Sequence, residues 1–140
     1  MSEFEPVFPF EFIVYGTPVS HQRENPKARL EWKELVRTAA RTLLSEQFQF
    51  ATNKRLSATL FYFPNDKMQG DVDNIIKLTL DAMSAYIYID DAQIERVVVQ
   101  KFEPGRLFSF SNPSETLLNC ITGPKPALYI RLSDPHEGLV

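Results

Sequence analysis

Five aspartates lie within a single 21-residue stretch near the middle of the chain. They are Asp71, Asp73, Asp81, Asp90 and Asp91. Carboxylates at this density are costly to hold together unless a cation lies among them. Hard divalent cations such as Mg²⁺ prefer carboxylate oxygens, and a cation held in this way can polarise a bound water molecule for hydrolysis. The stretch therefore predicts a cation site with hydrolytic potential.

Residues 73–85 have the pattern of a helix, because no Pro or Gly interrupts them and good helix formers dominate. At about 100° per residue, the polar side chains fall on one narrow stripe, which holds Asp73, Lys77, Asp81 and Ser84. Apolar residues fill the rest of the circumference, so the polar stripe should face a cleft. Asp71 lies just before the first turn, where free backbone N–H groups and the helix dipole favour anions.

The second part of the aspartate stretch follows an apolar run. Residues 86–89 alternate Tyr and Ile, which is typical of a short strand. Such a strand delivers Asp90 and Asp91 at its far end, from where they could return beside the start of the helix.

Each of these residues also has a purely structural interpretation. An Asp before a helix is usually a cap, Lys77 could form a surface ion pair with Asp73 or Asp81, and Asp90 with Asp91 could make a turn. The combination favours a functional role, because a helix that needs only a cap would not use both Asp71 and Asp73.

Length and composition fit one globular domain over residues 1–140, with 44% hydrophobic residues and a net charge of −3. No apolar run approaches the roughly 18 residues needed to span a membrane, and the acidic N-terminus differs from a targeting presequence. Cys120 is the only cysteine, which excludes an intrachain disulfide and a cysteine-based zinc site and suits the cytoplasm.

Positive charge is concentrated in residues 20–55, which carry a net charge of +4 and leave −7 for the remainder. A row of basic residues recurs every four positions within it: Arg29, Lys33, Arg37 and Arg41. The row is either a solvated helix face or a face directed at phosphates. Further candidates for phosphate contacts are Arg23, Lys54, Arg55 and Lys67.

The remaining pattern predicts the elements that position these side chains. Strands are expected at 10–15, 56–63, 94–102 and 127–132, and a first helix at 27–48. Residues 1–9 have the composition of a loose tail, and residues 103–126 that of a long loop or insertion. The predicted fold class is α+β, a two-layer domain with a mixed β-sheet packed against two main helices.

Three short motifs together resemble the core signature of the RusA-like Holliday junction resolvases, crossover junction endodeoxyribonucleases often found in prophages. They are Gly-Asp-Val-Asp-Asn-Ile-Ile-Lys at 70–77, Asp-Ala at 81–82 and Asp-Asp-Ala-Gln at 90–93. A weaker similarity, Gly-Thr-Pro at 16–18 followed by Arg23, extends the resemblance over about residues 10–102. Two departures are an interval between the helix start and the acidic pair that is about one residue short, and a longer region after Glu103.

The resemblance implies roles for individual residues. Asp71, Asp73 and Asp91 match the family's magnesium ligands, Lys77 matches the lysine needed for cleavage, and Asp90 and Asp81 match further family positions. It also implies branched DNA, a four-way junction, as the partner, and a homodimer whose two-fold symmetry matches that of the junction.

These lines together predict a Mg²⁺-dependent structure-specific endodeoxyribonuclease, with Mn²⁺ as a substitute metal. It would resolve Holliday junctions by symmetric phosphodiester hydrolysis in DNA recombination and repair. Two alternatives stay open: a junction-binding protein that no longer cleaves, and a metal-dependent phosphohydrolase of small nucleotides.

Overall fold

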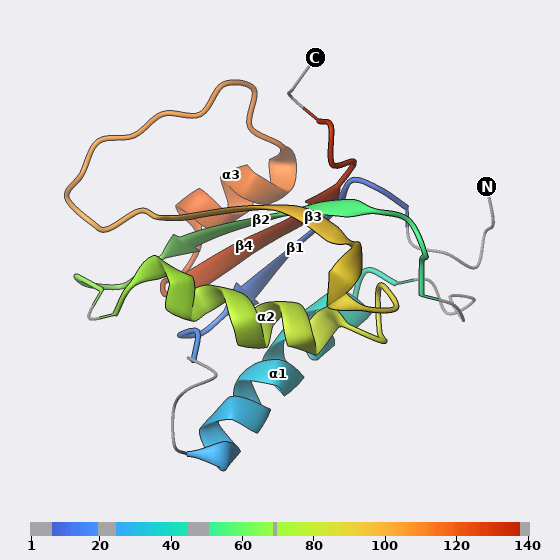
Figure 1. Ribbon diagram of the computed structural model, residues 1–140. Helices are drawn as coiled ribbons and strands as arrows, with labels where there is room; N and C mark the ends of the chain where they lie inside the picture. Colours follow the sequence, from blue (N-terminus) through green and yellow to red (C-terminus); the bar gives the residue numbers. More distant parts are fainter. Residues whose placement is uncertain (1–6, 20–24, 45–50, 69, 138–140) are drawn as a thin grey trace.

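The computed structural model describes residues 7–19, 25–44, 51–68 and 70–137. Its elements, in chain order, are β1 (Phe10–Tyr15), α1 (Pro26–Arg41), β2 (Leu56–Phe63), the 3₁₀ turn η1 (Val72–Ile75), α2 (Ile76–Met83), the 3₁₀ turn η2 (Asp91–Gln93), β3 (Ile94–Lys101), α3 (Glu115–Thr122) and β4 (Ala127–Ser133) (Figure 1). None of the helices in these ranges is long and apolar enough to cross a bilayer.

The four strands form one mixed sheet in the order β1-β4-β2-β3. β4 pairs antiparallel with both β1 and β2, whereas β2 and β3 are parallel. Parallel neighbours need a long crossover connection, and here that connection is η1, α2 and η2. The aspartate stretch is therefore the crossover between two adjacent strands, and the predicted α+β class with a mixed sheet is confirmed.

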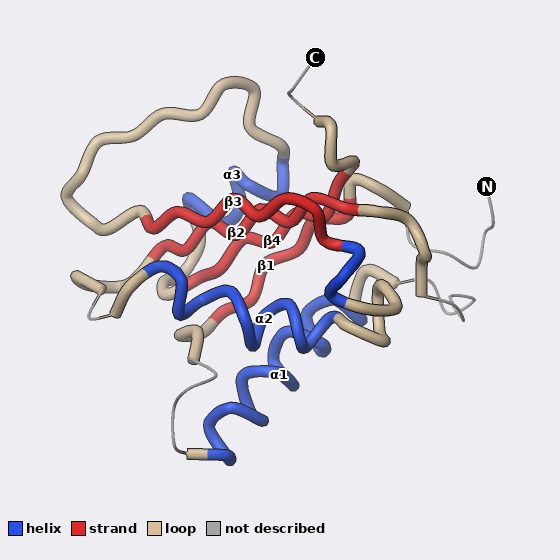
Figure 2. The backbone as a smooth tube through the Cα atoms, viewed as in Figure 1, coloured by secondary structure: helices blue, strands red, loops and turns tan. Residues whose placement is uncertain are grey.

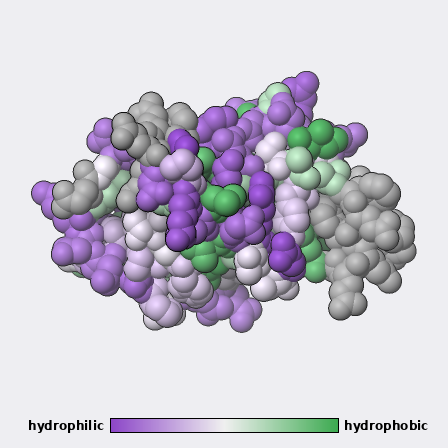
Figure 3. All heavy atoms as spheres, turned by 90° about the horizontal axis from the view of Figure 1, so that it is seen from below, coloured by the Kyte–Doolittle hydropathy of each residue, from purple (hydrophilic) through white to green (hydrophobic). Residues whose placement is uncertain are grey.

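The helices α1 and α2 pack on one face of the sheet, as Figure 2 shows. Trp32, Val36 and Ala40 recur every four residues along α1 and are fully buried against that face. The indole Nε1 of Trp32 donates a buried hydrogen bond of 3.1 Å to Thr79 Oγ1 of α2. This bond fixes α2, and with it the polar stripe, relative to α1. Seen from the side of these helices, the surface is mostly hydrophilic with a few apolar patches (Figure 3).

The other face of the sheet carries α3, which the sequence analysis missed when it assigned residues 103–126 to a loop (Figure 1). Ser114 caps the helix by accepting a hydrogen bond from the N–H of Leu117 at 3.1 Å. Leu117 and Cys120 then bury against the sheet. Residues 102–114, the β3–α3 loop, are the part of that segment that is extended and irregular.

Several predicted boundaries were wrong. The first helix ends at Arg41, and of the extension predicted to residue 48, residues 45–48 lie outside the described ranges. The second helix starts as the 3₁₀ turn η1 and ends at Met83, because Ser84 is extended and Ala85 has a φ of +64°. Residues 86–89 form a turn, in which Tyr88 makes only isolated bridges, and not the predicted strand. Most of the predicted tail, residues 1–6, also lies outside the described ranges.

Candidate active site

Asp71 and Asp73 lie at the start of the crossover helix, and both are exposed. Asp71 occupies the N-cap position of η1, yet its side chain makes no capping hydrogen bond; only its carbonyl accepts one, from the N–H of Asn74 at 3.1 Å. The capping interpretation therefore does not explain the Asp71 carboxylate. Both carboxylates are available to a cation or to solvent at the positive end of the helix.

Lys77 connects α2 to η2. Its Nζ lies 3.0 Å from Asp81 Oδ1, one turn further along α2, and 3.3 Å from Asp91 Oδ2 in η2. The ion pair with Asp81 confirms one of the structural interpretations of Lys77, and the second contact, with Asp91, joins residues 14 positions apart. The side chain of Lys77 remains 53% exposed despite the two ion pairs.

The hydroxyl of Tyr88 lies behind this group. It donates to the carbonyl oxygen of Leu80 at 2.6 Å and lies 3.4 Å from Asp91 Oδ1. Tyr88 is fully buried, and burial together with the negative charge of Asp91 raises its pKa far above the usual value. Tyr88 therefore stays neutral and lies against Asp91 on its buried side. Sequence reasoning missed this residue, since an apolar run gives no indication that one of its tyrosines faces the acidic cluster.

The two carboxylates that share Lys77 differ in acidity. Burial raises the pKa of Asp91, and a hydrogen bond shared with Asp81 raises it further despite the nearby Lys77. For Asp81, partial burial raises the pKa, but hydrogen bonds with Asp91 and Lys77 outweigh it, so the pKa lies below its usual value. The same two carboxylates raise the pKa of Lys77. Of the pair, Asp91 takes up a proton first as the pH falls, and Lys77 stays charged.

Asp90 and Gln93 form a capping box around η2. The Asp90 carboxylate accepts from the N–H of Ala92 at 3.1 Å, and Gln93 Oε1 accepts from the N–H groups of Ile89 and Asp90. The amide nitrogen of Gln93 donates in turn to the carbonyl oxygens of Thr52 and Lys54, at 2.9 and 2.8 Å. The Asp-Asp-Ala-Gln motif is thus a device that fixes the backbone that carries Asp91, and Asp90 serves as its cap.

The side chains of the candidate site are of the type that binds a divalent metal, but their arrangement around a metal is incomplete. Carboxylates are the donors that Mg²⁺ prefers. The turn η1, which carries Asp73, packs against β3, and β3 begins immediately after η2, the turn that carries Asp91. Among the described residues, however, no three His, Cys, Asp or Glu side chains converge as a set that could hold a metal. The cation between Asp81 and Asp91 is instead the Lys77 ammonium.

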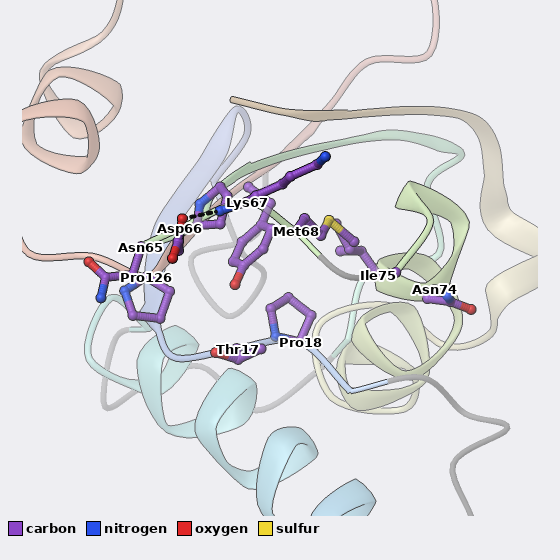
Figure 4. Close-up of a pocket in the computed structure, with 12 residues that line it drawn as sticks. Thr17, Pro18, Asn65, Asp66, Lys67, Met68, Asn74, Ile75 and Pro126 are labelled. Carbon is purple, nitrogen blue, oxygen red and sulfur yellow. Dashed lines mark hydrogen bonds between the residues drawn. The ribbon is translucent and has the colours of Figure 1, made fainter. Parts of the chain in front are cut away.

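A cavity of about 550 Å³ lies beside the start of the crossover helix (Figure 4). Thr17 and Pro18 form one wall, and Lys67 and Met68 lie opposite, with Asn74 and Ile75 at the end next to Asp73. The Gly-Thr-Pro segment and the aspartate motif, which are about fifty residues apart in sequence, therefore border one hollow. Its size is that of typical small-molecule sites.

The basic residues predicted to contact phosphates divide into two groups. Those near the site are Lys67, on the cavity wall, and Lys33, whose charge adds to the hydrogen bonds that lower the pKa of Asp81. Arg29 lines a smaller hollow together with Lys33.

The second group has structural partners. Arg37 Nε donates to the carbonyl oxygen of Ala82 at 2.9 Å, Arg41 Nε contacts the Tyr86 hydroxyl at 3.2 Å, and Arg55 pairs with Glu95 at 2.6 Å. The row of Arg29, Lys33, Arg37 and Arg41 is therefore not uniformly a solvated face or a face directed at phosphates. Arg37 and Arg41 join α1 to Ala82 of α2 and to Tyr86 in the turn that follows. The backbone carbonyl oxygen of Lys54 accepts the hydrogen bond from the side-chain amide of Gln93. Arg23 lies outside the described ranges.

These features define an α+β domain with an acidic, lysine-containing site on the crossover between two parallel strands, next to an open cavity. The family profile of endodeoxyribonuclease RusA matches residues 16–107, which include all five clustered aspartates and Lys77. The chain belongs to this family of endodeoxyribonucleases, as the sequence resemblance indicated, and membership implies an endonuclease for Holliday junctions. No curated protein matches the chain.

Proposed function

We propose that this protein is a Mg²⁺-dependent endonuclease that resolves four-way DNA junctions by symmetric phosphodiester hydrolysis, in DNA recombination and repair. The observation that carries the proposal is the position of Lys77, whose Nζ lies 3.0 Å from Asp81 and 3.3 Å from Asp91 while the side chain stays exposed. An ammonium group in such a position can bind a phosphate oxygen and stabilise charge that develops on it.

In this proposal Asp71, Asp73 and Asp91 hold the Mg²⁺ ion, for which Mn²⁺ can substitute. The metal would polarise the attacking water and neutralise the phosphoryl group and the leaving oxygen. Asp71 and Asp73 present exposed carboxylates, and Asp91 lies beside the Tyr88 hydroxyl in a turn whose backbone Gln93 fixes. The raised pKa of Lys77 keeps its positive charge available at neutral pH. Asp81 keeps the lysine side chain oriented.

The DNA would approach over Lys67 on the cavity wall and over Lys33 and Arg29 of α1, with the cavity beside η1 open to the scissile strand. A symmetric homodimer would bring two such sites to the two strands that must be cut. We also propose that the protein acts in the cytoplasm. Further phosphate contacts in this proposal come from Arg23, Arg37, Lys54 and Arg55. For Arg37 and Arg55, binding a phosphate would mean sharing the side chain with the partner it already has.

A second candidate, hydrolysis of small nucleotides, is favoured by the cavity volume of about 550 Å³, which would admit a single nucleotide. A junction-binding protein without cleavage is the third, and it requires only the basic surface. Both are distinguished from the nuclease by the same assay, since neither cuts a labelled junction.

The test incubates the protein with a four-way junction labelled on each strand in turn, with Mg²⁺, with Mn²⁺ or with a chelator. Native protein should make paired cuts only with metal, and Asp73→Asn and Asp91→Asn should reduce the rate by at least about a hundredfold, the scale of losing a group that acts in the transition state. Asp134→Asn is the matched control, since Asp134 is an exposed aspartate outside the cluster. Equal cutting by Asp73→Asn and native protein would refute the assignment of the site. Release of phosphate from free nucleotides without junction cleavage would favour the second candidate.

A further inference from the structure

The β3–α3 loop starts at the C-terminal end of β3. This end of the sheet is also the one from which the chain leaves β2 and enters the aspartate motif. β2 and β3 run parallel and end together, with Tyr62 opposite Lys101. The Glu103 carboxylate accepts a hydrogen bond of 2.7 Å from the N–H of Met68, three residues before Asp71. The base of the loop is therefore attached to the wall of the cavity beside the candidate active site.

The tip of this loop is apolar and exposed. Leu107 is 104% exposed, the largest value among the exposed large hydrophobic residues, and the adjacent Phe108 is 41% exposed. Glu103-Pro104-Gly105-Arg106 has the sequence of a type II turn, and Gly105 has the φ of +86° that such a turn requires at its third residue. The side chain of Leu107 is therefore fully accessible to a partner molecule.

The loop is held in shape although its tip protrudes. The Phe108 ring lies 4.8 Å from that of Phe102 and 6.0 Å from that of Phe63, and the Phe110 ring lies 5.2 Å from Phe102, all between centroids. This aromatic cluster continues the core beneath α3. Ring pairs of this kind stabilise a fold beyond the effect of the area that they bury. The aromatic cluster therefore anchors the loop segment that follows Leu107 to the rest of the fold.

Positive charge surrounds the base of the loop. The pKa of Glu103 lies below its usual value, first because of the Met68 hydrogen bond, and further because of nearby positive charges. These charges belong to Lys101, Arg106 and Lys67. The three cations lie between the cavity wall, which also carries Asp66, and the loop tip, and a phosphate backbone attracts charges of this sign.

We propose that the tip of the β3–α3 loop is a DNA contact at the branch point, in which Leu107 packs against an unstacked base while Arg106, Lys101 and Lys67 hold the flanking phosphates. Proteins that open or bend DNA commonly insert an apolar side chain between bases in this way, and a four-way junction offers bases whose stacking is already interrupted. The inference rests on the proposed function and adds the element that would distinguish a branch point from continuous duplex. Leu107 is the last residue of the family match, so Phe108 and Phe110 lie outside it, whereas Phe63 and Phe102 lie within it.

The test uses full-length protein in the presence of a chelator, so that binding is measured without cleavage. A four-way junction carries the fluorescent base analogue 2-aminopurine beside the branch point, and a continuous duplex carries it in the same sequence. Native protein should raise the junction fluorescence by roughly twofold or more, because the analogue brightens when it leaves the stack. Leu107→Ser should abolish this rise. Leu118→Ser is the matched control, since Leu118 is a leucine of α3 that is 46% exposed.

Arg106→Gln tests the phosphate contact separately. It should make the logarithm of the junction binding constant less dependent on the logarithm of salt concentration, by about 0.9 for one lost phosphate contact. An unchanged fluorescence rise with Leu107→Ser, or no rise with native protein that binds the junction, would overturn the inference and leave the proposed function standing. A protein that does not bind junctions at all would refute the proposed function instead. Sedimentation analysis completes the test, because loss of self-association in Leu107→Ser would assign the loop tip to a protein interface.

Discussion

Gln93→Ala should both destabilise the protein and displace Asp91, because one side chain satisfies two backbone N–H groups and two carbonyl oxygens. The carbonyl oxygen of Thr52 is in a partly buried hydrogen bond, whereas the other three bonds are more exposed. An intramolecular hydrogen bond contributes about 0.5–1.5 kcal/mol net, and exposed groups regain water when it is lost. The sum is about 2–3 kcal/mol of unfolding free energy, at the low end of that range for the three exposed bonds.

Urea denaturation followed by circular dichroism measures this loss, with Gln100→Ala as the matched control on the exposed face of β3. The junction assay measures the accompanying fall in cleavage rate. Gln93→Glu separates the two functions of the side chain: it keeps an acceptor for the N–H groups of η2 but places a carboxylate oxygen against the two carbonyls, which breaks the tether. A loss below about 0.5 kcal/mol for Gln93→Ala, the lower limit for even one hydrogen bond, would refute the claim that the tether, the hydrogen bonds from Gln93 to residues 52 and 54, stabilises the fold. Full cleavage activity in that variant would refute the claim that the tether positions Asp91.

Three further predictions concern separate contacts. Thr79→Val leaves the buried Nε1 of Trp32 without its 3.1 Å acceptor and should cost about 1–3 kcal/mol of unfolding free energy, measured by urea denaturation with the fluorescence of the single tryptophan; a smaller loss would show that the indole is satisfied in another way. Lys77→Met should abolish cleavage but keep junction binding, and should cost at most about 1 kcal/mol of stability because both ion pairs are partly exposed; retained cleavage would exclude a role for the ammonium. The hydrogen bond from Arg131 lowers the pKa of Glu137, so this carboxylate adds stability that is present above its ordinary pKa near 4.5 and is lost as the pH falls through the lowered value. Glu137→Gln should therefore be less stable than native protein at neutral pH and equally stable in strong acid, and a constant difference across the pH range would contradict this assignment.

The sequence was informative where the pattern is local. The apolar runs that became β1 and β2 were bounded correctly by Gly16 and Pro64, which end each strand through backbone geometry alone. The capping signal of α3 was equally local, since Ser114 is followed by Leu117 and Cys120 at helical spacing, but the surrounding Pro, Gly and Asn residues obscured it.

The site itself depended on contacts between distant segments. The helical spacing placed Asp73, Lys77 and Asp81 on one stripe, but only the return of the chain through η2 makes Asp91 the second partner of Lys77. Gln93 was recognised as part of a motif, whereas its bonds to residues 52 and 54 depend on how the segment before β2 lies in the fold. Whether Asp71 and Asp73 converge with Asp91 around a metal stays a prediction.

The position of β4 within the sheet determines when the chain can complete its fold during synthesis. β4 comes after the other three strands in chain order, yet it lies between β1 and β2 and, within the described ranges, supplies the only pairing that joins them. Contacts between residues so far apart in sequence form late and slowly. A nascent chain that has been translated only as far as residue 126 already contains all five clustered aspartates, Lys77 and the complete β2–α2–β3 unit. It cannot close its sheet, so the nuclease would acquire its final architecture only after the ribosome has added the strand at 127–133.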